Sequence, residues 1–209
     1  MKKTIAAVVC AAAAALSVQA HAEDAKVLRM ACESTYAPFV FFDSETGKLK
    51  GFEIDLLEYV AKEMGRKLEV TNMGFDAIIP SMLTGITDVG ASAFTITPER
   101  AKRVLFSKPY YISGLSILVR AEDKDKIKSV KDIENCTICA QIGTSGSMRA
   151  AKVPGAKVRN FNTINDAYLE LGNKGCKAVI TDRPVTAYFL AVRPETAKTY
   201  YHLPTVLNR

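Results

Sequence analysis

The chain contains few of the residues from which catalytic and metal centres are usually built. Its 209 residues include two histidines, His21 and His202, which cannot supply a histidine-based catalytic triad. A zinc site needs a second ligand pair beside Cys136 and Cys139, and only Cys176 and the two histidines are available for it. The segment 143–147 lacks the lysine and the spacing of a nucleotide-binding P-loop. We therefore expect no metal and no cofactor.

Charge of one sign and long apolar runs are also scarce. The formal net charge is +6, but lysine and arginine are interspersed with acidic residues, so no nucleic-acid-binding footprint is present. The longest apolar run, residues 5–18, is too short to span a bilayer comfortably. It follows a basic start at residues 1–3 and precedes a small-x-small cleavage pattern at residues 20–22. We therefore predict a cleaved signal peptide over residues 1–22 and a soluble, exported product.

The remaining cysteines suggest a disulfide in an oxidising compartment. Cys136 and Cys139 lie in a predicted strand, where residues three apart are separated by about 10 Å and point to opposite faces, so they should not pair with each other. Cys136 and Cys176 each open a strand pattern, and these strands are expected to be neighbours. We predict a Cys136–Cys176 disulfide.

Strand and helix patterns alternate along the mature chain, which predicts an α/β fold with a mostly parallel sheet in each of two lobes. The charged stretch 121–131 is expected to lie on the surface, and the lobes to divide near residues 110–114, giving lobe 1 over 23–112 and lobe 2 over 113–205. The predicted strands are 27–32, 68–72, 88–93, 115–120, 136–142, 157–161 and 178–181, and the predicted helices are 52–64, 76–83, 147–152, 164–171, 184–192 and one starting at 98.

Arg100 occupies an electrostatically unfavourable place. Thr97-Pro98 is typical of a helix start, so Arg100 falls in a first turn, where the helix dipole disfavours a cation. A bound carboxylate, held by the forked guanidinium, would remove this conflict. The alternative is an exposed arginine in a basic helix, because Lys102 and Arg103 follow.

Several other residues that could contact a ligand through a side chain or the backbone follow predicted strands, where ligands of open α/β sheets bind. These residues are Glu33, Tyr36, Ala93, Thr95, Thr144, Ser145 and Asp182. Together with Arg100 they suit a free α-amino acid: the carboxylate at Arg100 and the amides of 144 and 145, the ammonium at Asp182, and the side chain against aromatic rings. Taken singly, Asp182 could instead cap a helix and Tyr36 could belong to the core.

The motifs as a set resemble the periplasmic polar-amino-acid-binding proteins of ATP-binding-cassette (ABC) importers, with the glutamine-binding type most similar. The matching segments are 51–56 (GFEIDL), 75–80 (FDAIIP), 95–100 (TITPER), 106–111 (FSKPYY), 143–147 (GTSGS), 166–172 (DAYLELG) and 178–182 (AVITD). The resemblance implies the two-lobed periplasmic-binding-protein type II fold. It further implies a free L-amino acid ligand, a membrane permease as partner, a monomer and a periplasmic location.

Carried over by position, the resemblance implies a role for each site residue. Arg100 and the Ser145 amide would hold the carboxylate; Ala93, Thr95 and Asp182 the ammonium; Tyr36 and Phe75 the side chain; and Glu33, Gln141 and Thr181 its far end, with Ser92 and Thr144 completing the set. Glutamine binders tend to have aspartate, lysine and histidine where this chain has Glu33, Gln141 and Thr181. A glutamate there disfavours an acidic ligand, so an amide or basic side chain is expected.

Two other functions are possible on this fold. A cyclohexadienyl-dehydratase-like enzyme would also use Arg100, but it has no need of Asp182 as an ammonium partner. A sensor or receptor ligand-binding domain is the third class. Members of the resembled family return from the second lobe to the first near their C-terminus, and this chain stops at Arg209. The first lobe is therefore expected to be incomplete there.

Overall fold

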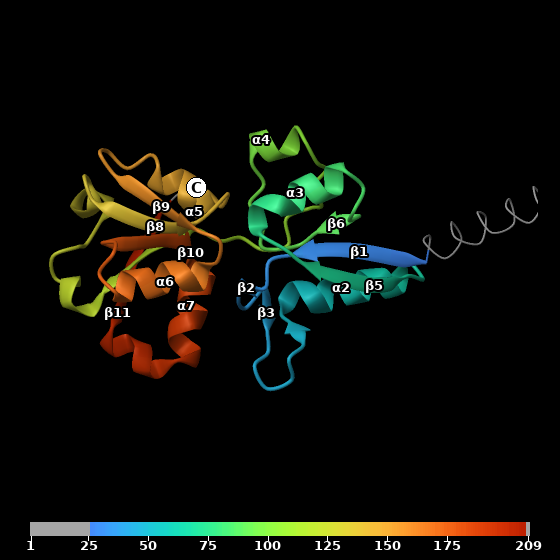
Figure 1. The fold of residues 1–209 in the computed structure, drawn as a ribbon, viewed down its shortest axis with the longest axis horizontal. Coiled ribbons are helices and arrows are strands. Elements are labelled where there is room, and N and C mark those ends of the chain that lie inside the picture. Colours follow the sequence, from blue (N-terminus) through green and yellow to red (C-terminus); the bar gives the residue numbers. More distant parts are fainter. Residues whose placement is uncertain (1–25, 208–209) are drawn as a thin grey trace, which may run out of the picture.

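Two α/β lobes joined by an extended segment make up the computed structural model, which describes residues 26–207 (Figure 1). The two-lobed type II architecture expected from the sequence is confirmed. The predicted signal peptide lies outside the described residues. Within residues 26–207, none of the helices has the length and apolar character needed to cross a bilayer.

The first lobe is built on a parallel sheet with strand order β5-β1-β6. A small antiparallel sheet of strands β2, β3 and β4 lies beside it. The strands are β1 (Val27–Cys32), β2 (Thr35–Tyr36), β3 (Val40–Phe42), β4 (Leu49–Lys50), β5 (Lys67–Asn72) and β6 (Val89–Gly90), and the helices are α2 (Phe52–Glu63), α3 (Phe75–Leu83) and α4 (Pro98–Ala101).

Alternation along β1 places helices on both faces of this sheet (Figure 1). Met30 packs in one cluster with Ile54 and Leu57 of α2, whereas Ala31 packs with Ile78 of α3 in another. The start of α2 requires Gly51, because its φ is +130° and a Cβ there would lie 2.2 Å from the Phe39 carbonyl oxygen.

The second lobe contains a five-stranded sheet with order β11-β7-β10-β8-β9. Strands β10, β8 and β9 are parallel, as expected, but β7 runs antiparallel to both β10 and β11, so the sheet is mixed. The strands are β7 (Leu115–Arg120), β8 (Thr137–Gln141), β9 (Lys157–Phe161), β10 (Ala178–Asp182) and β11 (Tyr200–Leu207).

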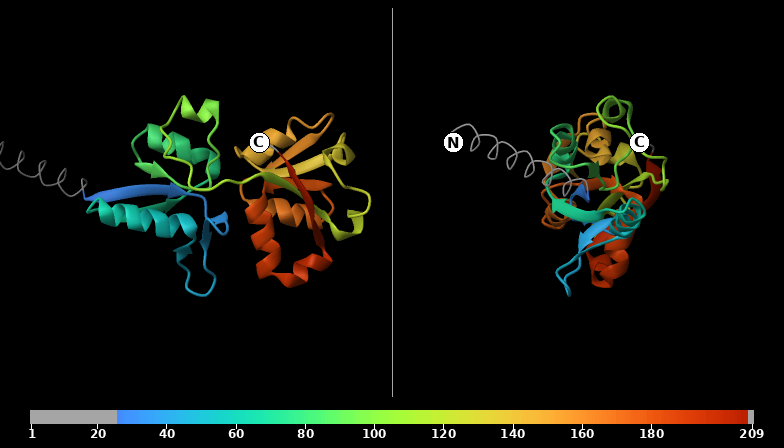
Figure 2. Two further views of the ribbon diagram at one scale, coloured as in Figure 1. Left: turned by 180° about the vertical axis from the view of Figure 1, so that it is seen from behind. Right: turned by 90° about the vertical axis from the view of Figure 1, so that its right-hand side faces the viewer.

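Helices cover both faces of this second sheet (Figure 2). Ile138 and Ile180 pack with Ala150 of α5, while Cys139 and Val179 point to the other face, among residues of α6 and α7. The helices are α5 (Ser145–Ala150), α6 (Ile164–Gly172) and α7 (Arg183–Val192), with 3-10 turns η1 (Ala121–Asp123), η2 (Val130–Ile133) and η3 (Pro194–Lys198).

The charged stretch 121–131 is only partly a surface segment, contrary to expectation. Asp123 is buried because it accepts hydrogen bonds from the side chains of Arg120, at 2.6 Å, and Lys177, at 3.0 Å. These two cations lower the pKa of its carboxyl against the opposing effect of burial. Ile127 is also buried, in the core beneath β7 and β8. A high density of charged residues therefore did not suffice to predict the exposure of this segment.

The predicted Cys136–Cys176 disulfide is wrong: Cys139 pairs with Cys176, with their Cα atoms 6.0 Å apart. The reason is the register of β8 against β10, together with the face of the sheet to which Cys139 points. Val179 of β10 is the partner of Cys139, and the turn leading from α6 into β10 carries Cys176 over the same face. Cys136 precedes the strand and is a free, half-buried thiol.

The segment 102–114 carries the chain from α4 to β7, between the two lobes (Figure 1). It has no regular secondary structure, and its aromatic residues pack against the first lobe: Tyr110 lies beside Phe52, and Tyr111 beside Phe39. We call it the connector, and we keep the lobe boundary at residues 112 and 113 as a proposal.

Candidate functional site

Arg100 lies inside the molecule. Thr97 caps α4 by accepting a hydrogen bond from the Arg100 backbone N–H at 3.2 Å, and the side chain then turns inward, leaving the residue 8% exposed. Its guanidinium donates to the carbonyl oxygens of Thr95, at 2.8 Å, and of Gly143 in the second lobe, at 2.9 Å. The alternative of an exposed arginine in a basic helix is therefore wrong.

A stacked pair of aromatic rings lies beside the Arg100 guanidinium. Phe75 and Phe94 have ring centroids 4.4 Å apart, and the guanidinium carbon lies 5.3 Å and 5.1 Å from them respectively. Such cation–π contacts hold the forked group in one plane. Phe75 was expected to face a ligand side chain together with Tyr36; here it contacts Arg100. Phe94 was not singled out from the sequence.

Asp182 and Tyr36 meet across the lobes. The Tyr36 hydroxyl donates to the Asp182 carboxylate at 2.6 Å and lies 3.0 Å from the Thr181 hydroxyl. Burial, followed by the nearby Asp182 charge, raises the pKa of Tyr36 well above its ordinary value. Asp182 stands at the N-cap position of α7, but its side chain makes no capping bond, so capping does not account for it. Tyr36 does pack in a core cluster as well, as the alternative supposed.

Glu33 and Gln141 form a second contact across the lobes. The Gln141 amide nitrogen donates to Glu33 at 2.8 Å and to the Asn162 carbonyl at 3.0 Å. The other Gln141 side-chain atom, Oε1, is buried without a hydrogen-bond partner among the described residues. Thr35 donates to both Glu33 oxygens, yet burial raises the pKa of the Glu33 carboxyl.

The remaining predicted residues lie in the same region. Thr95 donates to the Ser145 hydroxyl at 3.1 Å, which makes a further bond between the lobes. Thr144 caps α5 and donates to the Gln141 carbonyl at 2.7 Å. Ser92 exchanges hydrogen bonds with the Glu33 backbone. The predicted residues thus come together between the lobes, most of them buried and held in small hydrogen-bonded groups. We call these groups together the buried network.

Glu53 was missed as a member of this region. As an acidic residue at the start of α2 it was not assigned to the site, but it is fully buried, and both its carboxylate oxygens accept from the Ala93 backbone N–H, at 3.0 and 2.9 Å. The Tyr110 hydroxyl donates to the same carboxylate. A signal was available, because Glu53 shares a helix face with Leu57 and Ala61 at intervals of four residues.

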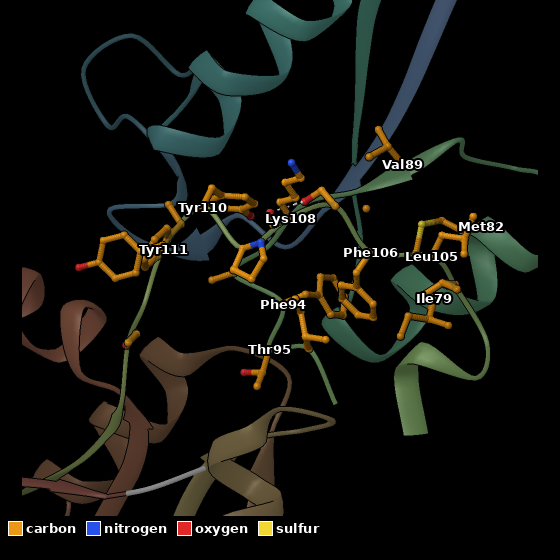
Figure 3. Close-up of a pocket in the computed structure, with 18 of the residues that line it drawn as sticks. Ile79, Met82, Val89, Phe94, Thr95, Leu105, Phe106, Lys108, Tyr110 and Tyr111 are labelled. Atoms are coloured by element: carbon orange, nitrogen blue, oxygen red, sulfur yellow. Dashed lines mark hydrogen bonds between the residues drawn. The ribbon is translucent and has the colours of Figure 1, made fainter. Parts of the chain in front are cut away.

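A cavity of about 460 Å³ opens beside this network (Figure 3). Most of its wall is apolar and comes from α3, β6 and the connector, as Ile79, Val89 and Leu105 illustrate in Figure 3. At one end it reaches Thr95 and, in the second lobe, Asp182. Among residues 26–207, no cluster of histidine, cysteine or acidic side chains suits a metal ion.

Comparison with known proteins gives the family. The model of bacterial extracellular solute-binding proteins, family 3, matches residues 28–190. The chain belongs to this family. A probable histidine-binding protein of Campylobacter jejuni is 33% identical over 83% of this solute-binding chain, and a probable amino-acid ABC transporter-binding protein of Haemophilus influenzae is 35% identical over 80%. The alignments cover 66% and 64% of those relatives, so the chain spans slightly less than two thirds of their length.

Solved structures agree with this assignment. An arginine-bound Gly52Ala mutant of ArgBP from T. maritima superimposes with a TM-score of 0.82 at 35% identity, covering 88% of this solute-binding chain and 84% of the other. An ancestral arginine-binding protein bound to glutamine and the ancestral amino-acid-binding protein AncCDT-1, a precursor of cyclohexadienyl dehydratase, each give 0.79 at 34% identity over 88% of this chain, covering 80% and 82% of their own. The resemblance to amino-acid-binding proteins of ABC importers is confirmed.

Proposed function

We propose that this chain captures a free L-amino acid with a basic or amide side chain between its lobes, outside the cytoplasm, and delivers it to the permease of an ABC importer. The observation that carries the proposal is the presence of a buried cationic group and a buried anionic group, each hydrogen-bonded to a neutral group of the opposite lobe. Arg100 and Asp182 are 8% and 4% exposed, and each bonds to a residue of the opposite lobe. An α-amino acid carries the two complementary charges.

Binding would exchange internal hydrogen bonds for ligand bonds. Asp182 accepts from a neutral hydroxyl, that of Tyr36, and a ligand ammonium is the stronger partner because it adds the attraction between opposite charges to the hydrogen bond. Arg100 likewise donates to two carbonyls, and a carboxylate would accept from its fork more strongly. The ligand charges would thus replace weaker partners without leaving either group uncompensated.

The preference for a basic or amide side chain rests on Glu33 and Gln141. A buried polar atom without a partner costs about 1–3 kcal/mol, so the Gln141 Oε1 atom favours a ligand that brings a hydrogen-bond donor. The neighbouring Glu33 carboxyl favours a donor with positive charge and disfavours an acidic ligand. The arginine-bound and glutamine-bound relatives support this class.

Binding without catalysis is the function that we favour. A prephenate-type acid would use Arg100 and leave Asp182 facing a ligand without a cation. The precursor relation of AncCDT-1 to a dehydratase makes this alternative worth testing in the same assay. Turnover of such an acid by the purified protein would support the enzyme; turnover is not expected.

Calorimetric titration with each of the twenty amino acids tests the proposal directly. We expect saturable one-to-one binding of arginine, lysine, histidine or glutamine, and no binding of aspartate or glutamate. Asp182→Asn removes the charge while keeping the shape, and it should abolish most of that affinity. Absence of binding for all twenty at millimolar concentration would refute the proposal.

A separate prediction concerns Glu33 and the ligand charge. Glu33→Gln should weaken binding of a cationic amino acid by about 10-fold to 150-fold, the effect of losing a hydrogen bond to a charged group, and should affect glutamine much less. Titration of both ligands into both proteins measures the difference. Equal losses for arginine and glutamine would count against a direct contact.

The same carboxyl predicts a pH dependence. Burial raises the pKa of Glu33 above its ordinary value of 4.5 in the protein without ligand, and a cation favours the charged form. Affinity for arginine should therefore be full above that raised pKa and fall as the pH drops through it, with a proton released on binding inside this window. Glu33→Gln should remove this component of the pH profile.

A further inference from the structure

We propose that Glu53 is a positioning residue that joins the turn at Ala93, in the ligand site, to the connector between the lobes. The inference rests on the proposed function. It concerns a carboxyl group that is buried outside the set expected to touch the ligand. Both of its partners are donors, and they come from different segments: the Ala93 backbone N–H follows β6, and the Tyr110 hydroxyl belongs to the connector.

The turn at Ala93 needs such a support. Its φ is +51°, a left-handed conformation that costs an alanine about 1–2 kcal/mol. The residues leading into it are each held by another segment: the Ala91 N–H donates to the Ala31 carbonyl of β1, and the Ser92 hydroxyl bonds to the Glu33 backbone. Glu53 holds Ala93, the last of these three residues, by accepting from its backbone N–H. The direction of the Ala93 carbonyl, and of the chain to Thr95, therefore depends on this carboxylate.

The connector is held at the same place. Tyr110 bonds to Glu53, and its ring lies 5.8 Å from that of Phe52, so two adjacent residues at the start of α2 fix it. β7 of the second lobe begins five residues later, at Leu115. Because Glu53 accepts hydrogen bonds from both segments, a movement of the Ala93 turn or of the connector would displace the same carboxylate.

A carboxylate suits this position better than an amide. Ala93 N–H and Tyr110 O–H both donate, and a charged carboxylate accepts from both, whereas glutamine offers one acceptor and turns a donor toward the other partner. The Glu53 carboxylate is surrounded by protein, since the residue is fully buried. The neighbouring Cys32 thiol reflects this environment, because burial and the charges of Glu33 and Glu53 raise the pKa of Cys32 to about 12. Loss of the Ala93 N–H or of the Tyr110 hydroxyl therefore removes one of the two donors to a buried carboxylate.

Tyr110→Phe tests the inference most cleanly, because it removes one hydroxyl and keeps the ring on Phe52. We expect faster hydrogen exchange at the Ala93 amide, measured by NMR without ligand, and about 10-fold weaker amino-acid binding, the loss of one charge-assisted hydrogen bond. Glu53→Gln should act in the same direction. Asp55→Asn, which removes a carboxylate from the exposed face of the same helix, should change neither quantity by more than about twofold.

The outcomes separate this inference from the proposed function. If the wild-type protein binds an amino acid, and Tyr110→Phe leaves both the Ala93 exchange rate and the affinity unchanged, Glu53 is only a structural residue and the inference is wrong. If the wild-type protein binds no amino acid, the proposed function fails and the coupling to a ligand fails with it, whatever the exchange rate shows. A faster exchange together with weaker binding, at an unchanged urea unfolding midpoint, supports the inference.

Discussion

Replacing Arg100 by alanine is expected to weaken amino-acid binding by about 30-fold to 4,000-fold. Truncating one partner of a buried, hydrogen-bonded charge pair costs about 2–5 kcal/mol, and each 1.4 kcal/mol is roughly a factor of ten in Kd. Arg100 meets the conditions for such a loss, because it is buried and its guanidinium lies against the stacked rings of Phe75 and Phe94. The ligand carboxylate would keep its charge and lose its cationic partner.

Two control variants separate this role from general effects. Arg103→Ala removes the same side chain from an exposed position three residues later, and its Kd should stay within about twofold of the wild type. Arg100→Lys keeps the charge and loses the planar fork, so its affinity should fall between those of the wild type and Arg100→Ala. Equal Kd values for Arg100→Ala and Arg103→Ala would refute the assignment.

Ligand variants complete the test, because each deletes one charge from the small molecule. Agmatine is arginine without its carboxylate, and it should bind the wild-type protein far more weakly than arginine does. In Arg100→Ala the preference for arginine over agmatine should shrink sharply, since only the backbone amides of Thr144 and Ser145 would then distinguish the two ligands. An undiminished preference in that variant would show that Arg100 does not hold the carboxylate.

The sequence predicted best those elements that a local residue pattern defines. Strands 27–32, 115–120 and 157–161 have the predicted bounds, and the helix starts at residues 52, 98 and 164 are also as predicted. Apolar runs between capping residues and glycines define such elements locally. The predicted strand 88–93 shortens to Val89–Gly90, because pairing with β1 ends there and the chain turns at Ala93.

Elements that depend on a partner segment were missed. β11 contains Pro204 and is buried only at intervals, since it is an edge strand whose register shifts between His202 and Val206. Proline is confined to such edges and bulges, so a local pattern argues against the strand that tertiary pairing creates. Strands β2 to β4 are two or three residues long and carry too little pattern to be recognised.

The candidate site likewise has features that local sequence predicted and features that depend on tertiary contacts. The residue types at the strand ends indicated which side chains gather, and the buried network contains them. The residue types did not predict the hydrogen-bond partners of these side chains within the protein. The bonds from Arg100 to the Gly143 carbonyl and from Tyr36 to Asp182 depend on how the two lobes meet. Glu53 was missed for a related reason, because a carboxylate in a first turn is usually explained by the helix dipole.

The Cys139–Cys176 disulfide should contribute about 4 kcal/mol to the free energy of unfolding, the chain-entropy value for a closed loop of 37 residues. The bridge links the middle of β8 to the entry of β10, next to the sheet centre, so its loss also loosens the two strands that end in Gln141 and Asp182. Cys139→Ala with Cys176→Ala should lower the melting temperature by roughly 8–16 °C for a chain of this size.

The free cysteine provides the matched control for the disulfide. Cys136→Ala should change the free energy of unfolding by less than about 0.5 kcal/mol, because Cys136 is half-buried and unpaired. Reductant should destabilise the wild-type protein and Cys136→Ala to the level of the double variant, and should leave the double variant unchanged, since only a protein with the bridge can lose it. If Cys136→Ala were instead the destabilised and reductant-insensitive protein, the bridge would join Cys136 to Cys176, and β8 would have to shift its register against β10.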